Sequence, residues 1–147
     1  MAPCVRDLEV KATPAEIWKS CFVPMKWEQW DPDVEAIEDV SGDCVNGTTF
    51  TFVMISDSVK RIPVTLSDVK ENETLRFAGA AVHGLMKFDG FIEIKAKDES
   101  SSTITYSFSM FGLLGSLVNW MNPVVVSGGV EKGLENMKKI AEGTMEQ

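Results

Sequence analysis

The chain has 147 residues, of which 44% are hydrophobic, so we expect a single domain spanning 1–147 with one sizeable core. Its formal net charge of −8 argues against a nucleic-acid partner and against an anionic membrane surface, since both require clustered Lys and Arg. Three cysteines without CxxC spacing and one histidine are too few ligands for a metal site, so we expect free thiols in a reducing cytoplasm and no metal or other cofactor.

The first part of the chain predicts a short strand followed by two short helices. Weak alternation over Leu8–Ala12 indicates an edge strand. Thr13–Glu16 combines an N-cap, a proline at the first helical position and a capping box, which predicts a helix that Pro24 ends. A second short helix or turn places Trp27 and Trp30 on one face.

Six strands with short turns between them are expected next. Each has apolar residues at alternate positions, and therefore one apolar and one polar face. This pattern predicts an antiparallel sheet that is covered on one side and wet on the other. The predicted strands are Val34–Ser41, Thr48–Ile55, Lys60–Lys70, Thr74–His83, Lys87–Lys97 and Thr103–Met110.

The segment from Gly115 to Glu142 predicts the helix around which the sheet closes. Its second half is amphipathic, with charged and apolar residues on opposite faces. The first half breaks this phase. The helix therefore kinks near Asn122-Pro123 or near Ser127–Gly129, or its first half is apolar on both sides.

The stretch 100–130 contains no charged residue, which raises the question of a membrane span. Ser, Thr, Asn and Pro interrupt it, and its first part alternates like a strand, so we expect burial inside the protein and no membrane span. A straight helix turns Leu117, Met121 and Val124 outward. Monomers rarely expose such an apolar strip, so we predict that a second copy or a partner protein covers it, in the first case as a homodimer through the first half of the helix.

Acidic residues concentrate in the middle of the chain. Eight of them lie between Glu28 and Asp57 with no basic residue among them, which predicts a solvated acidic face or, as the alternative, an acidic docking patch. The segment that begins at Asp31 resembles the start of a calcium loop, but Ala36 stands where the loop requires glycine.

Three segments of the chain resemble a known family. Glu9–Trp18 is similar to the family's opening strand, proline and helix. Trp27–Val34 reads WEQWDPDV, similar to its W-x-x-W-x-P-x-V segment, and Gly133–Glu142 is similar to its closing GLxxLKxxxE. The chain thus resembles the START/Bet v 1-like (SRPBCC) superfamily, and more narrowly its polyketide cyclase/dehydrase-like branch.

The resemblance implies an α+β helix-grip fold. In this fold a curved antiparallel sheet of six or seven strands, in the order β-α-α-β6-α, wraps around a long C-terminal helix. The resemblance also favours a cavity between the sheet and that helix. One departure is Pro123 with the Gly128-Gly129 pair, inside a segment that is usually a continuous helix. Function is specified poorly, because fold does not imply function and the family is diverse.

Three functions remain open. The leading hypothesis is binding of a small hydrophobic ligand, such as a lipid, an aromatic or a polyketide-like compound, in the cavity. The second is a cyclase or dehydratase-like enzyme that uses the same cavity, with His83 and Tyr106 as catalytic residues. The third is a protein-interaction module with a filled core. Few polar residues are expected on the inner face, which places binding ahead of catalysis.

The expected cavity wall combines bulky side chains with gaps at small residues. His83 lies in phase with the inward face at the end of its strand, where it is either a general base or ligand contact, or an ordinary hydrogen-bonded histidine. Tyr106 is expected to point inward, where its hydroxyl needs a partner. The predicted ligand-binding residues are Trp30, Phe50, Phe52, Phe77, Gly79, Ala81, His83, Ile92, Tyr106, Phe108, Met121 and Val125.

Overall fold

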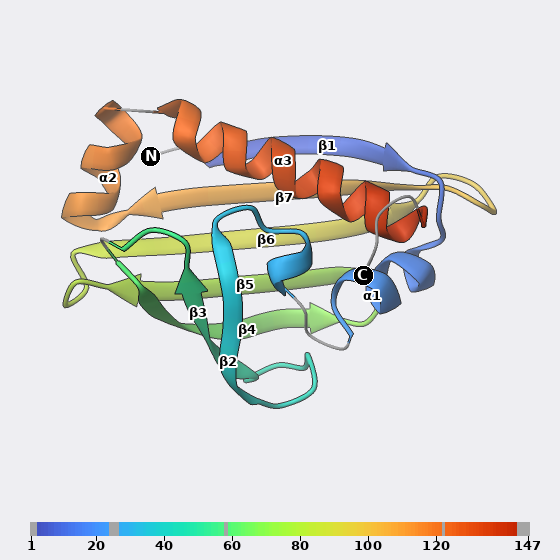
Figure 1. Ribbon diagram of the computed structural model, residues 1–147. Coiled ribbons are helices and arrows are strands. Elements are labelled where there is room, and N and C mark those ends of the chain that lie inside the picture. The colour runs from blue at the N-terminus through green and yellow to red at the C-terminus, as the bar shows by residue number, and fades with distance from the viewer. Residues whose placement is uncertain (1–2, 24–26, 58, 122, 144–147) are drawn as a thin grey trace.

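Seven antiparallel strands form one curved sheet in the order β1-β7-β6-β5-β4-β3-β2, as Figure 1 shows. The computed structural model describes residues 3–23, 27–57, 59–121 and 123–143. The α+β helix-grip fold expected from the sequence is therefore confirmed. The strands are β1 (Cys4–Val10), β2 (Val34–Ser41), β3 (Thr49–Met54), β4 (Arg61–Lys70), β5 (Thr74–Ala81), β6 (Met86–Ala96) and β7 (Ser102–Phe111).

The two short helices after β1 are α1 (Pro14–Cys21) and the 3-10 helix η1 (Trp27–Gln29). The predicted capping box begins α1. The Thr13 hydroxyl accepts a hydrogen bond from the Glu16 backbone N–H at 3.2 Å, and the Glu16 carboxylate accepts one from the Thr13 N–H at 3.2 Å. The predicted Pro24 stop lies outside the described residues.

The C-terminal segment forms two helices, α2 (Gly112–Met121) and α3 (Pro123–Ala141). The two helices lie on either side of Asn122, which belongs to one of the two predicted kink positions and is outside the described residues, while α3 runs on through Gly128 and Gly129. Figure 1 shows α2 turned at an angle to α3. Gly112 makes the turn from β7 into α2 at φ +78°, where an added Cβ would lie 2.6 Å from the Leu85 carbonyl oxygen.

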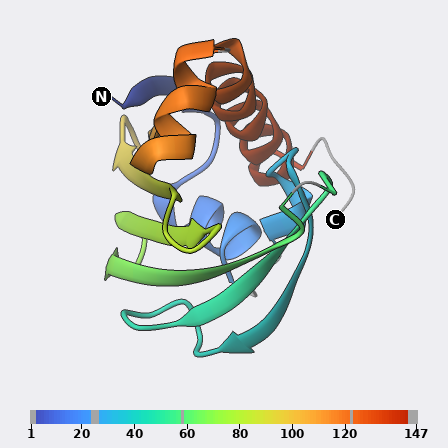
Figure 2. The same cartoon turned by 90° about the vertical axis from the view of Figure 1, so that its left-hand side faces the viewer.

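Helix α3 covers the concave face of the sheet, as the end-on view in Figure 2 shows. Its inward stripe is fully buried and faces β1 and β7, while the charged residues lie on the opposite side. The buried residues of this stripe are Val126, Val130, Leu134, Met137 and Ile140. Within the described residues, none of the helices is both long and apolar enough to cross a membrane.

An aromatic cluster fills the part of the core under η1. The Trp27 ring centroid lies 4.7 Å from that of Trp30 and 5.0 Å from that of Phe77. Both tryptophans are completely buried and anchor this segment in the core.

The glycines of the inner face support neighbouring rings and leave no gap for a ligand. Phe77 pairs with Gly90 across β5 and β6, and Gly79 pairs with Phe88 in the same ladder. A Cβ added at Gly90 would lie 2.2 Å from the Phe77 ring, and one at Gly79 would lie 2.7 Å from the Phe88 ring. The expectation that Gly79 leaves room in the cavity is therefore wrong, because an aromatic side chain from the next strand covers it.

Candidate ligand-binding cavity

A cavity of about 500 Å³ lies between the concave face of the sheet, the segment that links η1 to β2, and the first half of α3. A volume of this size suits a small organic molecule. The lining residues from the sheet are Val34, Phe52, Met54, Ile62, Phe77, Met86, Phe88, Tyr106, Phe108 and Met110. Those from α3 are Val125, Val126, Gly129 and Val130, and those from the connecting segments are Asp31, Pro32, Asp33, Ile55, Ser56 and Val59.

The mouth of the cavity lies between the turn after β3 and the start of α3. Ile55 is 60% exposed and Val125 is 51% exposed, and both line the cavity. Phe77 and Val130 are buried and form part of its deep wall. The cavity therefore opens to solvent at one end and ends in the apolar core at the other.

The polar part of the wall comes mainly from one short segment and one strand. Asp31 and Asp33 flank Pro32 just before β2, and Tyr106 reaches the cavity from β7. The Asp31 carboxylate accepts a hydrogen bond from the Asp33 backbone N–H at 3.0 Å, which fixes the turn. A Cβ added at Gly129 would lie 3.0 Å from the Asp33 carboxylate, so this glycine lets α3 approach the acidic segment closely.

The two carboxylates have no cationic neighbour in the cavity. Within the described part of the chain, the lining contains no Lys, Arg or His, and neither aspartate takes part in an ion pair. Burial raises the pKa of Asp31 to about 7, and repulsion from Asp33 adds to this, while the hydrogen bond from the Asp33 N–H acts in the opposite direction. Asp33 is exposed to solvent, and the partial burial of its carboxylate still raises its pKa. Near neutral pH, Asp31 therefore exists in both protonated and ionised forms.

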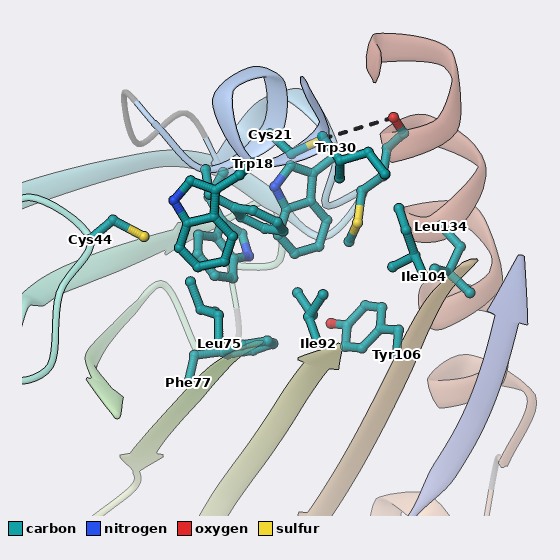
Figure 3. Close-up of a cluster of buried hydrophobic side chains, with 14 of the residues drawn as sticks. Trp18, Cys21, Trp30, Cys44, Leu75, Phe77, Ile92, Ile104, Tyr106 and Leu134 are labelled. Atoms are coloured by element: carbon teal, nitrogen blue, oxygen red, sulfur yellow. Dashed lines mark hydrogen bonds between the residues drawn. The ribbon is translucent and has the colours of Figure 1, made fainter. Parts of the chain in front are cut away.

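Tyr106 places a hydroxyl at the deep end of the cavity. Its residue is only 3% exposed, and the hydroxyl makes no hydrogen bond to the described residues. Burial, followed by the negative charges of Asp31 and Asp33, raises the pKa of Tyr106 well above its usual value. The ring packs edge-on against Trp30 at 6.0 Å, and Figure 3 shows it reaching from its strand toward the space below the tryptophan. The group is therefore neutral, fixed in place and unpaired.

The indole N–H groups of Trp27 and Trp30 are also buried without a hydrogen-bond partner among the described residues. The Trp27 N–H approaches the Asp31 carboxylate closely enough to lower its pKa but does not reach hydrogen-bond geometry. The region around Asp31 and Tyr106 thus contains several polar atoms whose bonding capacity is unused.

Five of the twelve residues predicted from the sequence line the cavity, namely Phe52, Phe77, Tyr106, Phe108 and Val125. Trp30, Phe50 and Ile92 are buried in the core outside the lining. Gly79 and Ala81 also lie outside it, and Met121 is 69% exposed at the end of α2. The alternation of the strands identified the inner face of the sheet but did not show which part of that face borders empty space.

The expectation that His83 points inward is wrong. Strand β5 ends at Ala81, and Val82 and His83 follow with φ +55° and +54° in a turn closed by the bond from the Gly84 N–H to the Ala81 carbonyl. Strand alternation ends where the chain reverses, so His83 is exposed and outside the cavity lining. Of the two predicted catalytic residues, the structure places only Tyr106 in the cavity wall.

Reasoning from the sequence missed Asp31 and Asp33, because an acidic stretch usually forms a solvated face. A usable signal was present in the WEQWDPDV segment. Two tryptophans that are both buried at i,i+3 bring the residue directly after them to the core boundary, and that residue is Asp31.

Comparison with known proteins agrees with this architecture. The family model described as polyketide cyclase / dehydrase and lipid transport matches residues 2–142. No curated protein sequence matches the chain.

Solved structures resemble the chain over nearly its whole length. The protein XoxI from Bacillus cereus is 13% identical, with a TM-score of 0.73 over 99% of this chain and 100% of that one. Norcoclaurine synthase from Thalictrum flavum, in complex with dopamine and hydroxybenzaldehyde, is 15% identical, with a TM-score of 0.70 over 99% of this chain and 88% of that one. The di-domain ARO/CYC BexL from the BE-7585A biosynthetic pathway is 11% identical, with a TM-score of 0.72 over 97% of this chain and 47% of that one.

At these identities the structural likeness establishes the fold alone. The family match covers nearly all of the sequence and agrees with the seven-stranded sheet closed on α3. The chain belongs to the polyketide cyclase/dehydrase and lipid transport family, within the START/Bet v 1-like (SRPBCC) superfamily.

Proposed function

We propose that the protein binds a small hydrophobic molecule in the cavity between its sheet and α3. The observation that carries this proposal is an open, mostly apolar space of about 500 Å³ with polar groups confined to one part of its wall. Sites for small organic ligands combine these two features, since the apolar wall supplies affinity and the few polar groups fix orientation.

The ligand class expected from the sequence, a lipid, an aromatic or a polyketide-like compound, fits this wall. The rings of Phe77 and Phe108, whose centroids are 6.2 Å apart, offer faces and edges for a planar or branched apolar body. The family description includes lipid transport, and one structural neighbour holds dopamine and hydroxybenzaldehyde. These relatives support a role in binding without specifying the ligand.

A pair of substitutions at the mouth tests the proposal. Val125 lines the entrance, whereas Val124, which is 71% exposed, lies outside the lining. A neutral dye such as Nile red should bind the native protein with one-to-one stoichiometry. Val125→Trp should narrow the entrance and weaken dye binding by about tenfold or more, while Val124→Trp should leave it unchanged. Equal effects of the two substitutions, or no dye binding at all, would contradict the proposal.

An enzyme of the cyclase or dehydratase type is the second candidate, and the environment of Asp31 favours it. Burial raises the pKa of this carboxyl group to about 7, which suits proton transfer near neutral pH, and the Tyr106 hydroxyl lines the same cavity. In the dehydration of a β-hydroxy ketone, ionised Asp31 would take the proton from the α-carbon, and Tyr106 would protonate the departing hydroxyl, which leaves as water. Transfer of the proton from Asp31 to the tyrosinate, directly or through that water, would then restore both groups. Asp31→Asn should then abolish turnover and leave dye binding intact.

The third expectation, an interaction module with a filled core, agrees poorly with the open cavity. The three residues of its predicted apolar strip, Leu117, Met121 and Val124, are nevertheless all exposed, although the first two lie on α2 and Val124 lies on α3, which runs in another direction. Coverage of this strip by a second copy stays a prediction, and a substitution that tests it is given in the Discussion.

A further inference from the structure

We infer that the cavity selects ligands that carry a protonated amine on a compact apolar body, with the amine held by Asp31, Asp33 and the Tyr106 hydroxyl. This inference rests on the proposed function and specifies its ligand class. The chemical reason is that the described residues lining the cavity include two acidic groups and a hydroxyl without a described partner, but no positively charged side chain.

The first observation is the lack of a counter-charge. The groups that face the acidic segment are Tyr106 from β7 and the uncharged Val126, Gly129 and Val130 from α3. Cys4 of β1 is the remaining titratable group close enough to influence Tyr106. No described residue supplies Asp31 or Asp33 with a cationic partner.

Two basic residues on or next to strands of the sheet have acidic partners outside the cavity. Lys60, just before β4, pairs with Glu35 at 3.0 Å and lies 3.9 Å from Asp57. Arg6 of β1 pairs with Glu131 of α3 at 3.1 Å. Among the described residues that line the cavity, none supplies a positive charge, so a cationic ligand would provide the missing counter-charge.

The second, independent observation is Tyr106. This residue lines the cavity and is only 3% exposed. Its hydroxyl has no hydrogen-bond partner among the described residues. An ammonium group can donate up to three hydrogen bonds. An ammonium group in the cavity could donate hydrogen bonds to the Tyr106 hydroxyl oxygen and to one or both carboxylates. The surrounding aromatic rings also attract a nearby positive charge.

The same arrangement disfavours an anionic ligand. A carboxylate or sulfate head group would meet the negative charges of Asp31 and Asp33 where no described lining residue is Lys or Arg, and this repulsion costs free energy in a partly desolvated site. A neutral alcohol could donate one hydrogen bond but would leave the negative charge uncompensated. The structure therefore ranks head groups in the order amine, alcohol, acid.

Three compounds with the same apolar body test this order. Displacement of bound Nile red at pH 8 would be measured with 2-(1-naphthyl)ethylamine, 2-(1-naphthyl)ethanol and 1-naphthylacetic acid. The amine should bind about tenfold or more tighter than the alcohol, since a charge-assisted hydrogen bond replaces a neutral one, and the acid should bind most weakly. The advantage of the amine should shrink at pH 5, where Asp31 is protonated.

Matched variants assign the effect to the cavity. Asp31→Asn and Asp33→Asn should each reduce the ratio of amine affinity to alcohol affinity by about threefold or more, and this ratio is measured separately from the affinity of each variant for Nile red. Glu35→Gln removes one negative charge from an exposed position of β2 outside the lining, and should change neither quantity.

The outcomes separate the two proposals. If the amine displaces the dye no better than the alcohol, or if Glu35→Gln has the same effect as the aspartate variants, the inference is wrong. Dye binding that still depends on Val125 would then leave the proposed function standing. If native protein binds neither the dye nor any of the three compounds, the proposed function fails as well.

Discussion

Replacing Asp31 with Asn should stabilise the protein, and by more at high pH than at low pH. The folded protein holds this carboxyl group with a pKa near 7 against an ordinary value of 3.8. The stability contributed by its protonated form is therefore complete below pH 3.8 and is lost as the pH rises through 7. Asn cannot ionise, and its side-chain oxygen can still accept the hydrogen bond from the Asp33 N–H.

The magnitude follows from the two pKa values. The raised pKa of Asp31 lowers the free energy of unfolding by about 4 kcal/mol at pH 8 and by about 2 kcal/mol at pH 5.5, relative to a group with its ordinary pKa. The gain in the free energy of unfolding from Asp31→Asn should thus be larger at pH 8 than at pH 5.5 by about 2 kcal/mol. Water in the cavity that screens the charge would reduce this difference to about 1 kcal/mol.

Urea unfolding followed by tryptophan fluorescence at pH 5.5 and pH 8 measures this difference, because Trp18, Trp27 and Trp30 are all buried. Glu35→Gln is the matched control. Its partner Lys60 forms an exposed ion pair with it, so we expect an effect of about 0–1 kcal/mol at both pH values. A stabilisation by Asp31→Asn that does not depend on pH, or a loss of stability at pH 8, would refute the account of the acidic segment.

Three further predictions concern the rest of the fold. Gly90→Ala should lower the free energy of unfolding by about 2 kcal/mol or more, because its Cβ would lie 2.2 Å from an aromatic ring, whereas Gly128→Ala, with open space around it, should raise it by up to about 1 kcal/mol. Thermal unfolding would contradict this if both changes had the same sign. Burial raises the pKa of Cys21 to about 12 and of Cys44 to about 11, so a thiol reagent should modify at most one of the three cysteines in native protein and all three in urea. Rapid modification of all three in native protein would be inconsistent with this packing. If a second copy covers the outer strip, Met121→Glu should shift the mass measured by sedimentation toward the monomer without unfolding the chain, and a wild-type protein that is already monomeric would rule out self-association.

The sheet was largely predictable because a strand with one buried face alternates with a period of two residues. The predicted strand Val34–Ser41 matches β2 at both ends, and the four strands from β3 to β6 differ from prediction by at most two residues at either end. Strand β1 was placed too late in the chain. Only Val10 of this edge strand is buried, so its alternation is weak.

The cavity was harder to predict because its shape depends on contacts between strands. Small residues were expected to leave gaps in the cavity wall. The register of β5 and β6 instead places Phe88 over Gly79 and Phe77 over Gly90. The sequence likewise indicated that the C-terminal helix could kink, while the choice between the proline and the glycine pair depended on how α3 packs. Asp31 combines an acidic side chain with a buried neighbourhood, and its burial follows from the tertiary position of the two tryptophans before it.

The central claim is that a small apolar molecule enters the space between the sheet and α3, and methyl NMR tests it most directly. Nile red would be titrated into protein with ¹³C-labelled Ile, Leu and Val methyl groups. We predict shifts at Ile62, Val126 and Val130, which line the cavity, and little change at Leu113 and Leu117, which are exposed on α2. Shifts confined to the exposed leucines, with the cavity methyl groups unchanged at saturation, would show that the dye binds the outer surface and would contradict the account.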